Sequence, residues 1–163
     1  MKKTTLIIFV MALAIFTSIN VSGQKADFNG TWKLDASKST LPQFPVILMK
    51  IDIQIKGDSL LTERYYDTGD GQLYPFTENL TLDNKESHIT IYDMPRKTKA
   101  SWSEQGELLL ESATTVNGDS GPEDFKTKET WKTDSAAKTL TINFNNSMSA
   151  GEESGVFFFI KSE

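Results

Sequence analysis

The feature that most constrains this chain is a two-residue alternation of apolar and polar side chains, which recurs in short segments along most of its length. The clearest segment is 46–56, where apolar and polar positions alternate as Ile47, Met49, Ile51, Ile53 and Ile55 against Lys50, Asp52, Gln54 and Lys56. Successive side chains of a β-strand point to opposite faces, so the pattern predicts a strand with one buried face and one face in water. After residue 23, no window shows the apolar stripe of a helix.

Turn signals separate these segments at regular intervals. Turns rich in Gly, Asn and Asp are predicted at 57–58, 68–71, 83–85 and 105–106, and polar loops at 117–124 and 146–154. Strands at this spacing are expected of an all-β sandwich or barrel. We predict one all-β domain over 24–163, built as a single antiparallel up-and-down β-barrel of about 8–10 strands, because closure removes exposed sheet edges. A two-sheet sandwich is the alternative.

Residues 1–23 have the pattern of a cleavable secretory signal peptide of the bacterial type. Met1-Lys2-Lys3 is positively charged, 6–16 is apolar, and 18–23 supplies small and polar residues before Gln24. The apolar run is shorter than the roughly 20 residues that a membrane-spanning helix needs. We therefore predict that 1–23 is removed and that the protein is exported, to the periplasm or out of the cell.

The composition narrows the classes of partner. The chain has no cysteine, so an exported domain must depend on its core rather than on disulfides. Removing the leader takes away Lys2 and Lys3 and leaves 15 basic and 22 acidic residues, a net charge of about −7. This acidic balance argues against nucleic acid and against anionic membrane surfaces. We expect a monomer that does not insert into a membrane once the leader is cleaved.

The first predicted strand, 28–35, carries a large aromatic residue, Trp32, two positions after Gly30. Such a side chain can fold over one end of a closed sheet, and its indole N–H needs a partner when buried. We predict that Trp32 seals one end of the barrel.

This strand, Asn29-Gly30-Thr31-Trp32-Lys33-Leu34, resembles the early Gly-x-Trp motif of the calycin superfamily, which includes lipocalins and intracellular fatty-acid-binding proteins. The runs 125–131 (Phe-Lys-Thr-Lys-Glu-Thr-Trp) and 139–142 (Thr-Leu-Thr-Ile) are similar to small secreted bacterial lipocalin-like proteins. The resemblance implies a lipocalin-like β-barrel whose hydrophobic interior holds a small apolar ligand.

The chain departs from that pattern in two places. Its last strand, 156–160, reads Val-Phe-Phe-Phe-Ile, without the arginine that stacks on the lipocalin indole or the Arg-x-Tyr that holds a carboxylate in fatty-acid-binding proteins. The connection 36–45 is too short for their two-helix lid. The carboxylate-binding chemistry of those proteins is therefore not expected here.

Two charged residues are predicted to face the interior. Glu129 is in phase with Thr127 and Trp131, and Arg64 is in phase with Thr62 and Tyr66. A buried carboxylate must be paired or protonated, so an Arg64–Glu129 ion pair would be a polar handle within an apolar binding site. Two alternatives remain: a structural pair that sets strand register, and a one-residue slip of phase that leaves both groups in water.

Aromatic residues complete the predicted ligand site, which consists of Arg64, Tyr66, Trp102, Glu129 and Trp131. Plain core packing is the alternative for the aromatic members. The single histidine, His88, has no nucleophile motif near it, and no metal-ligand spacing is present. We therefore expect no enzymatic activity, no metal and no cofactor.

The predicted function is that of an exported, non-enzymatic binding protein for a small hydrophobic or amphipathic molecule held inside the barrel. The alternative is a protein-interaction or structural module with a filled barrel, whose binding surface would be 157–159 or the acidic loop 117–124. An open interior of several hundred Å³ would favour the first function.

Overall fold

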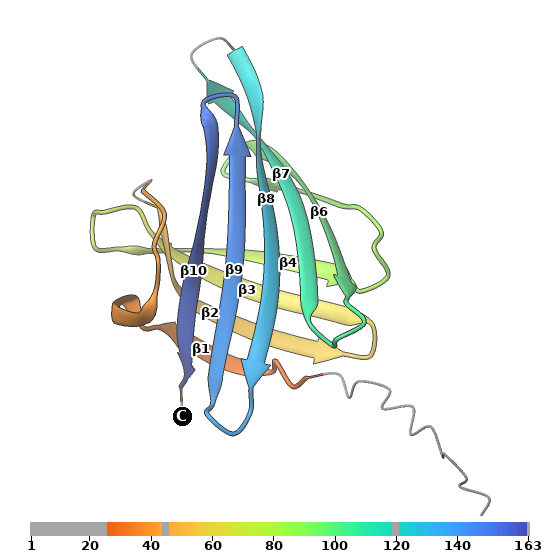
Figure 1. Cartoon of the computed structure of the whole chain (residues 1–163). Coiled ribbons are helices and arrows are strands. Elements are labelled where there is room, and N and C mark those ends of the chain that lie inside the picture. The colour runs from red at the N-terminus through yellow and green to blue at the C-terminus, as the bar shows by residue number, and fades with distance from the viewer. Residues whose placement is uncertain (1–25, 44–45, 119–120, 163) are drawn as a thin grey trace, which may run out of the picture.

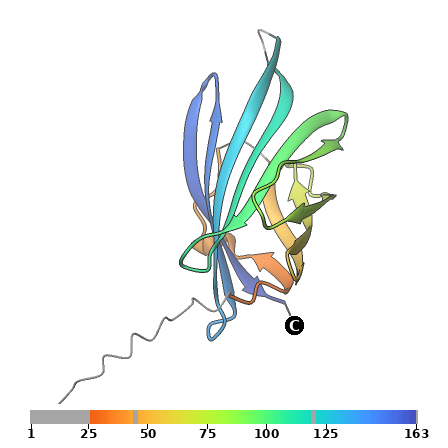
Figure 2. The same cartoon turned by 90° about the vertical axis from the view of Figure 1, so that its right-hand side faces the viewer.

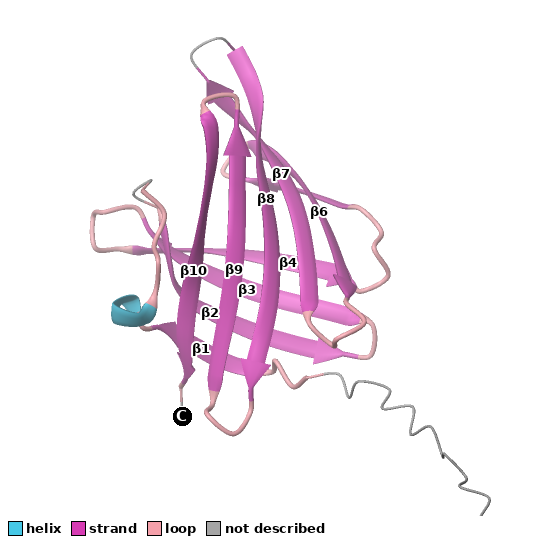
Figure 3. Ribbon diagram, viewed as in Figure 1, coloured by secondary structure: helices cyan, strands magenta, loops and turns pink. Residues whose placement is uncertain are grey.

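The computed structural model describes residues 26–43, 46–118 and 121–162, and the predicted leader lies outside these ranges. Within them, ten strands and one short 3-10 helix, η1 (Ala36–Lys38), make up the regular structure (Figure 1, Figure 3). No helix in this part of the chain is long and apolar enough to cross a membrane. The strands are β1 (Gly30–Leu34), β2 (Ile47–Lys56), β3 (Ser59–Asp67), β4 (Leu73–Thr81), β5 (Ser87–Ile91), β6 (Met94–Trp102), β7 (Leu108–Gly118), β8 (Gly121–Asp134), β9 (Thr139–Met148) and β10 (Gly151–Lys161).

All the strands belong to one antiparallel sheet in which sequence neighbours pair and the first strand pairs with the last. The order is β4-β3-β2-β1-β10-β9-β8-β7-β6-β5. On β1, Trp32 lies opposite Lys161 of β10, and Leu34 lies opposite Phe159. The two remaining edges are β4 and β5, which are consecutive in the chain, so the barrel is nearly closed. The predicted antiparallel up-and-down barrel is confirmed, and the sandwich alternative is wrong.

The up-and-down order gives the barrel two different ends. The connections after β2, β4, β6 and β8 lie at one end, called here the closed end. Those after β1, β3, β5, β7 and β9 lie at the other, called the open end, above which the β7–β8 and β9–β10 hairpins rise (Figure 1, Figure 2). The apolar core fills the interior from the closed end upward and includes the buried residues Phe28, Trp32, Leu60, Leu80, Ala100, Leu108, Trp131, Leu140, Ile142 and Phe159.

Trp32 is buried as predicted, and two contacts hold its side chain: a hydrogen bond from the indole N–H and a cation over the ring. Its indole Nε1–H donates to the carbonyl of Phe28 at 2.8 Å, so the buried donor is satisfied. The Nζ atom of Lys161 lies 5.2 Å from the centre of the indole ring. A cation from the last strand therefore lies on this tryptophan. It is a lysine, one residue after the apolar run 156–160, whereas the lipocalin pattern has an arginine.

Strand β2 departs from the predicted alternation. The predicted inward set began with Ile47 and Met49, but the structure buries Leu48 and leaves both of those half-buried. The cause is a shift in the β2–β3 register between Leu48 and Lys50, where an extra residue interrupts the ladder. Because 46–49 is apolar throughout, composition alone does not reveal which residue is the extra one.

Two segments predicted as long polar loops are mostly strand. Strands β7 and β8 extend to Gly118 and Gly121, so the predicted loop 117–124 is the tip of a hairpin. Likewise, β9 and β10 extend to Met148 and Gly151 within the predicted loop 146–154. Backbone pairing outweighs the turn-forming tendency of the Asn, Gly and Ser residues in these stretches.

Backbone and side chains both join the β4 side of the barrel to β6. Asp83, just after β4, forms an isolated antiparallel bridge with Ser101, and the Asn84 N–H donates to the carbonyl of Ala100 at 2.9 Å. Glu78 of β4 accepts hydrogen bonds from Arg96 Nε at 3.0 Å and from Thr98 Oγ1 at 2.6 Å, both on β6. Near the open end, the Tyr92 hydroxyl donates to the carbonyl of Pro75 at 3.1 Å. We call this boundary between β4 and β5–β6 the seam, and these side chains contribute to its closure together with the backbone bridge.

Replacing Glu78 by Gln should loosen the seam, because Arg96 then loses its charged acceptor. We expect the free energy of unfolding to fall by about 1–3 kcal/mol. We also expect amide hydrogen exchange, followed by mass spectrometry, to accelerate in β4 and β5 more than in β9 and β10. The control is Glu111→Gln, whose ion pair with Lys128 is exposed on the outer face. Equal exchange changes in all strands would show that Glu78 does not act at the seam.

Candidate functional site

Arg64 and Glu129 face each other inside the barrel, as predicted. Arg64 lies on β3 and Glu129 on β8, and four strands separate them in the sheet. Arg64 Nη1 lies 2.8 Å from Glu129 Oε1, and Nη2 lies 2.8 Å from Oε2. Their side chains are 1% and 8% exposed. This two-bond geometry joins opposite walls of the barrel away from water.

Four of the five predicted ligand residues form one contact group. The indole Nε1–H of Trp131 donates to Glu129 Oε2 at 3.0 Å, and Arg64 Nη1 lies 3.4 Å from the Tyr66 hydroxyl. The Arg64 guanidinium also lies 5.1 Å from the Trp131 ring centre. The fifth residue, Trp102, packs against Phe28, with 5.9 Å between ring centres. A role of these five residues in ligand binding remains a prediction.

The ion pair keeps both partners charged. Burial acts to raise the pKa of Glu129, but the charge and hydrogen bonds of Arg64 outweigh burial and hold that pKa below its ordinary value. Burial acts to lower the pKa of Arg64, and the charge of Glu129 outweighs it, so the Arg64 pKa lies well above its usual value. Burial raises the pKa of Tyr66, although Arg64 opposes the change, so the phenol keeps its proton.

A second interior pair, Glu78 and Arg96, was not among the predicted site residues. Besides its bonds to Glu78, Arg96 donates from Nη1 to Thr114 Oγ1 at 3.1 Å. The signal that would have found this pair was phase, since Arg96 alternates with the buried Thr98 and Ala100 on β6. Both arginines of the chain therefore lie inside the barrel, each paired with a glutamate.

Phe76 lies between the two pairs. Its ring centre is 6.0 Å from the Arg64 guanidinium and 5.6 Å from that of Arg96. The Tyr66 ring stacks on it at 5.6 Å, with an interplanar angle of 8°. We call Arg64, Glu78, Arg96 and Glu129 the polar layer. Phe76 is the apolar side chain that contacts both of its ion pairs.

The polar layer keeps unused hydrogen-bonding capacity. Arg64 Nε and Thr62 Oγ1 are both buried, and the described residues offer neither a hydrogen-bond partner. They belong to successive inward positions of β3, next to Glu78 and Phe76 of β4 in the register. An orphaned buried donor is costly, so these atoms mark the interior as a place that favours an added polar group.

Burial differs on the two sides of the polar layer. Inward side chains nearer the closed end are buried, such as Leu60, Leu108 and Leu140. Inward positions nearer the open end are mostly half-buried, although Thr114 is buried. The half-buried positions include Tyr66, Phe76, Met94, Ser112, Val116, Phe125, Thr127 and Asn146. The polar layer thus lies between a filled apolar core and a less filled, mixed polar and aromatic region that opens to solvent.

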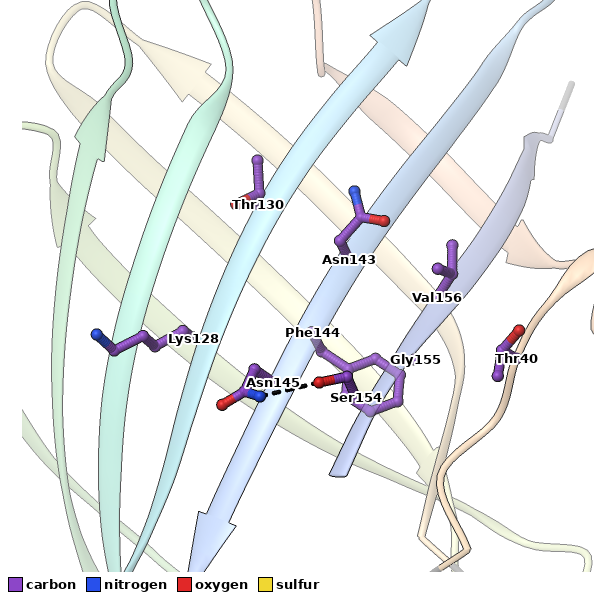
Figure 4. A pocket seen from close by; sticks show the side chains of 9 residues that line it. All are labelled: Thr40, Lys128, Thr130, Asn143, Phe144, Asn145, Ser154, Gly155 and Val156. Atoms are coloured by element: carbon purple, nitrogen blue, oxygen red, sulfur yellow. Dashed lines mark hydrogen bonds between the residues drawn. The ribbon is translucent and has the colours of Figure 1, made fainter. Parts of the chain in front are cut away.

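Two hollows lie on the outer face of the barrel, apart from the predicted residues. One, of about 510 Å³, is open to solvent on the outside of β8–β10, where Asn145 Nδ2 donates to Ser154 Oγ at 2.9 Å (Figure 4). It is lined by Thr40, Lys128, Thr130, Asn143, Phe144, Asn145, Ser154, Gly155 and Val156. The other, of about 310 Å³, lies outside β1–β3. Neither is lined by any of the five predicted ligand residues.

The fold and interior together define a nearly closed antiparallel β-barrel that is compatible with a binding module. No protein-family model matches the chain, and no curated protein matches it. Among solved structures, the chain is similar to secretory abundant heat soluble protein 4 from Ramazzottius varieornatus, with a TM-score of 0.48 and 9% sequence identity. That likeness covers 70% of this chain and 69% of the other, and it assigns neither family nor function.

Removing one charge of the Arg64–Glu129 pair should destabilise the protein more than removing both. We expect Arg64→Met and Glu129→Leu each to cost about 3–5 kcal/mol, because each leaves a buried unpaired charge. The double variant should cost less than the sum of the singles, which urea unfolding will measure. The exposed pair Lys128 and Glu111, at 3.4 Å, is the control and should show little coupling. Additive losses at 64 and 129 would contradict a coupled pair.

The lowered pKa of Glu129 predicts a loss of stability in acid. Its ordinary value is 4.5, and the native value is lower, so the unfolded chain binds the proton more tightly. The stabilisation is therefore complete above pH 4.5 and is lost as the pH falls through the native pKa. Urea unfolding between pH 7 and pH 3 should show the gap between wild type and Glu129→Gln narrowing below about pH 4.5. A constant gap would show that Glu129 does not titrate in this way.

Proposed function

We propose that this chain is an exported, non-enzymatic binding protein for a small hydrophobic or amphipathic molecule. The ligand would lie at the open end of the barrel, against the polar layer. The observation that carries the proposal is the ring of half-buried inward residues above two charge-balanced pairs, since small-molecule sites combine apolar walls with a few placed polar groups. The N-terminal leader pattern and the resemblance to secreted lipocalin-like calycins support export to the periplasm or medium and a monomeric state.

The proposed residues differ in burial, so they would contribute to binding in different ways. Tyr66 and Phe76 are half-buried, so a ligand can reach them from the open end. Arg64, Glu129 and Trp131 are almost fully buried, so they would act by holding Tyr66 in place rather than by touching the ligand. Trp102 would contribute to the core beside Phe28.

A protein-interaction module with a packed interior is the second candidate. The burial of Arg64, Glu129 and Trp131 favours it, as does the location of both hollows on the outer face. Of the surfaces considered earlier, 157–159 turns Phe157 and Phe159 inward, and only Phe158 points out, beneath Lys38. The hollow over β8–β10 is therefore a better surface for such a partner than 157–159 (Figure 4).

Native mass spectrometry of the protein purified from the envelope fraction of its own host tests the proposal. We expect a co-purifying mass that dissociates on denaturation. Tyr66→Ala should lose this mass, because the inward ring is removed from the open end. Tyr65→Ala should retain it, because Tyr65 points outward and packs under Lys50, with 4.1 Å from Nζ to the ring centre. A clean apo mass, with no change in tryptophan fluorescence across a panel of lipids and hydrophobic metabolites, would favour the interaction module.

A further inference from the structure

We propose that the polar layer selects ligands whose head group is an uncharged oxygen acceptor, such as an alcohol, amide or ester, and rejects carboxylates. This inference rests on the proposed function and names the ligand class of the same site. It follows from how the charges, the hydroxyl groups and the aromatic rings of the layer are arranged.

The interior charges of the layer cancel. Each arginine is held by the two carboxylate oxygens of one glutamate: Arg64 by Glu129 at 2.8 Å and 2.8 Å, and Arg96 by Glu78 at 3.0 Å and 3.4 Å. Trp131 and Thr98 add further donors to the same carboxylates. No guanidinium of the layer is left to neutralise a third carboxylate, so an anionic head group would be desolvated without a counter-ion.

Each arginine of the layer also donates to a neighbouring hydroxyl group. Arg64 donates to the Tyr66 hydroxyl at 3.4 Å, and Arg96 donates to Thr114 Oγ1 at 3.1 Å. A hydroxyl that accepts a bond keeps its own proton for donation. The two arginines thus polarise two O–H donors, which suit the lone pairs of a neutral oxygen and cost no charge burial.

Phe76 and Tyr66 fix where the carbon skeleton of such a ligand would lie. Their rings are stacked and half-buried, and both guanidinium groups lie within 6.0 Å of the Phe76 ring centre. A head group at the half-buried Tyr66 hydroxyl would have its adjoining carbons beside these stacked rings. The ligand class is therefore an amphipathic molecule with a neutral polar end and an apolar body.

Isothermal titration of the purified protein at pH 7 with dodecanol and with dodecanoate compares two heads on one carbon chain. We expect dodecanol to bind at least about tenfold more tightly. Glu129→Gln keeps the shape of the side chain and releases the charge of Arg64, so it should raise the affinity for dodecanoate by about tenfold or more. Circular dichroism establishes that the variant is folded. If it is not, Glu78→Gln provides the same release at Arg96, and Glu111→Gln is the surface control.

The outcomes separate the two proposals. Equal or tighter binding of dodecanoate by the wild type would overturn the head-group selectivity and leave the binding function standing. Stronger binding of dodecanol without any gain for dodecanoate in a folded Glu129→Gln or Glu78→Gln variant would overturn charge balance as its cause. Failure of the wild type and of both variants to bind either molecule would overturn this inference together with the proposed function.

Discussion

Arg64 and Glu129 join opposite walls of the barrel in a region where neither charge reaches water. Two charges removed from water are stabilised only by good mutual geometry and by further hydrogen bonds, which Trp131 and Tyr66 supply here. The positions of strands β3 and β8 are therefore tied to one another through side chains. The filled core lies on one side of this pair and the half-buried region on the other.

The second pair acts at a different place in the topology. A ten-stranded meander that pairs its first and last strands leaves two consecutive edges, β4 and β5, and here Glu78 of β4 pairs with Arg96 of the next strand, β6. One pair thus spans the interior, and the other spans the seam. The two are in contact through Phe76, so the interior charge balance and the closure of the barrel depend on adjoining side chains.

The period-two pattern was sufficient to predict the strands, the barrel and the inward direction of Arg64 and Glu129, because a buried face imposes strict alternation. It failed at Leu48, where a uniformly apolar run hides an extra residue. The Glu78–Arg96 pair was not predicted, although Arg96 is in phase with the buried Thr98 and Ala100, because its partner on β4 is set only when the sheet closes. Lys161 was missed because its register with Trp32 depends on the first strand meeting the last.

That pairing of β1 with β10 also bears on the order of events during folding. Residues 30–34 cannot complete their ladder until 159–161, at the far end of the chain, are present. Contacts of such long sequence separation form late, because the chain entropy of closing the loop must be overcome first. The barrel therefore stays incomplete until the whole chain is available to fold. The C-terminal strand thus decides when the native structure can form, because β1 lacks one of its two neighbours until β10 is present.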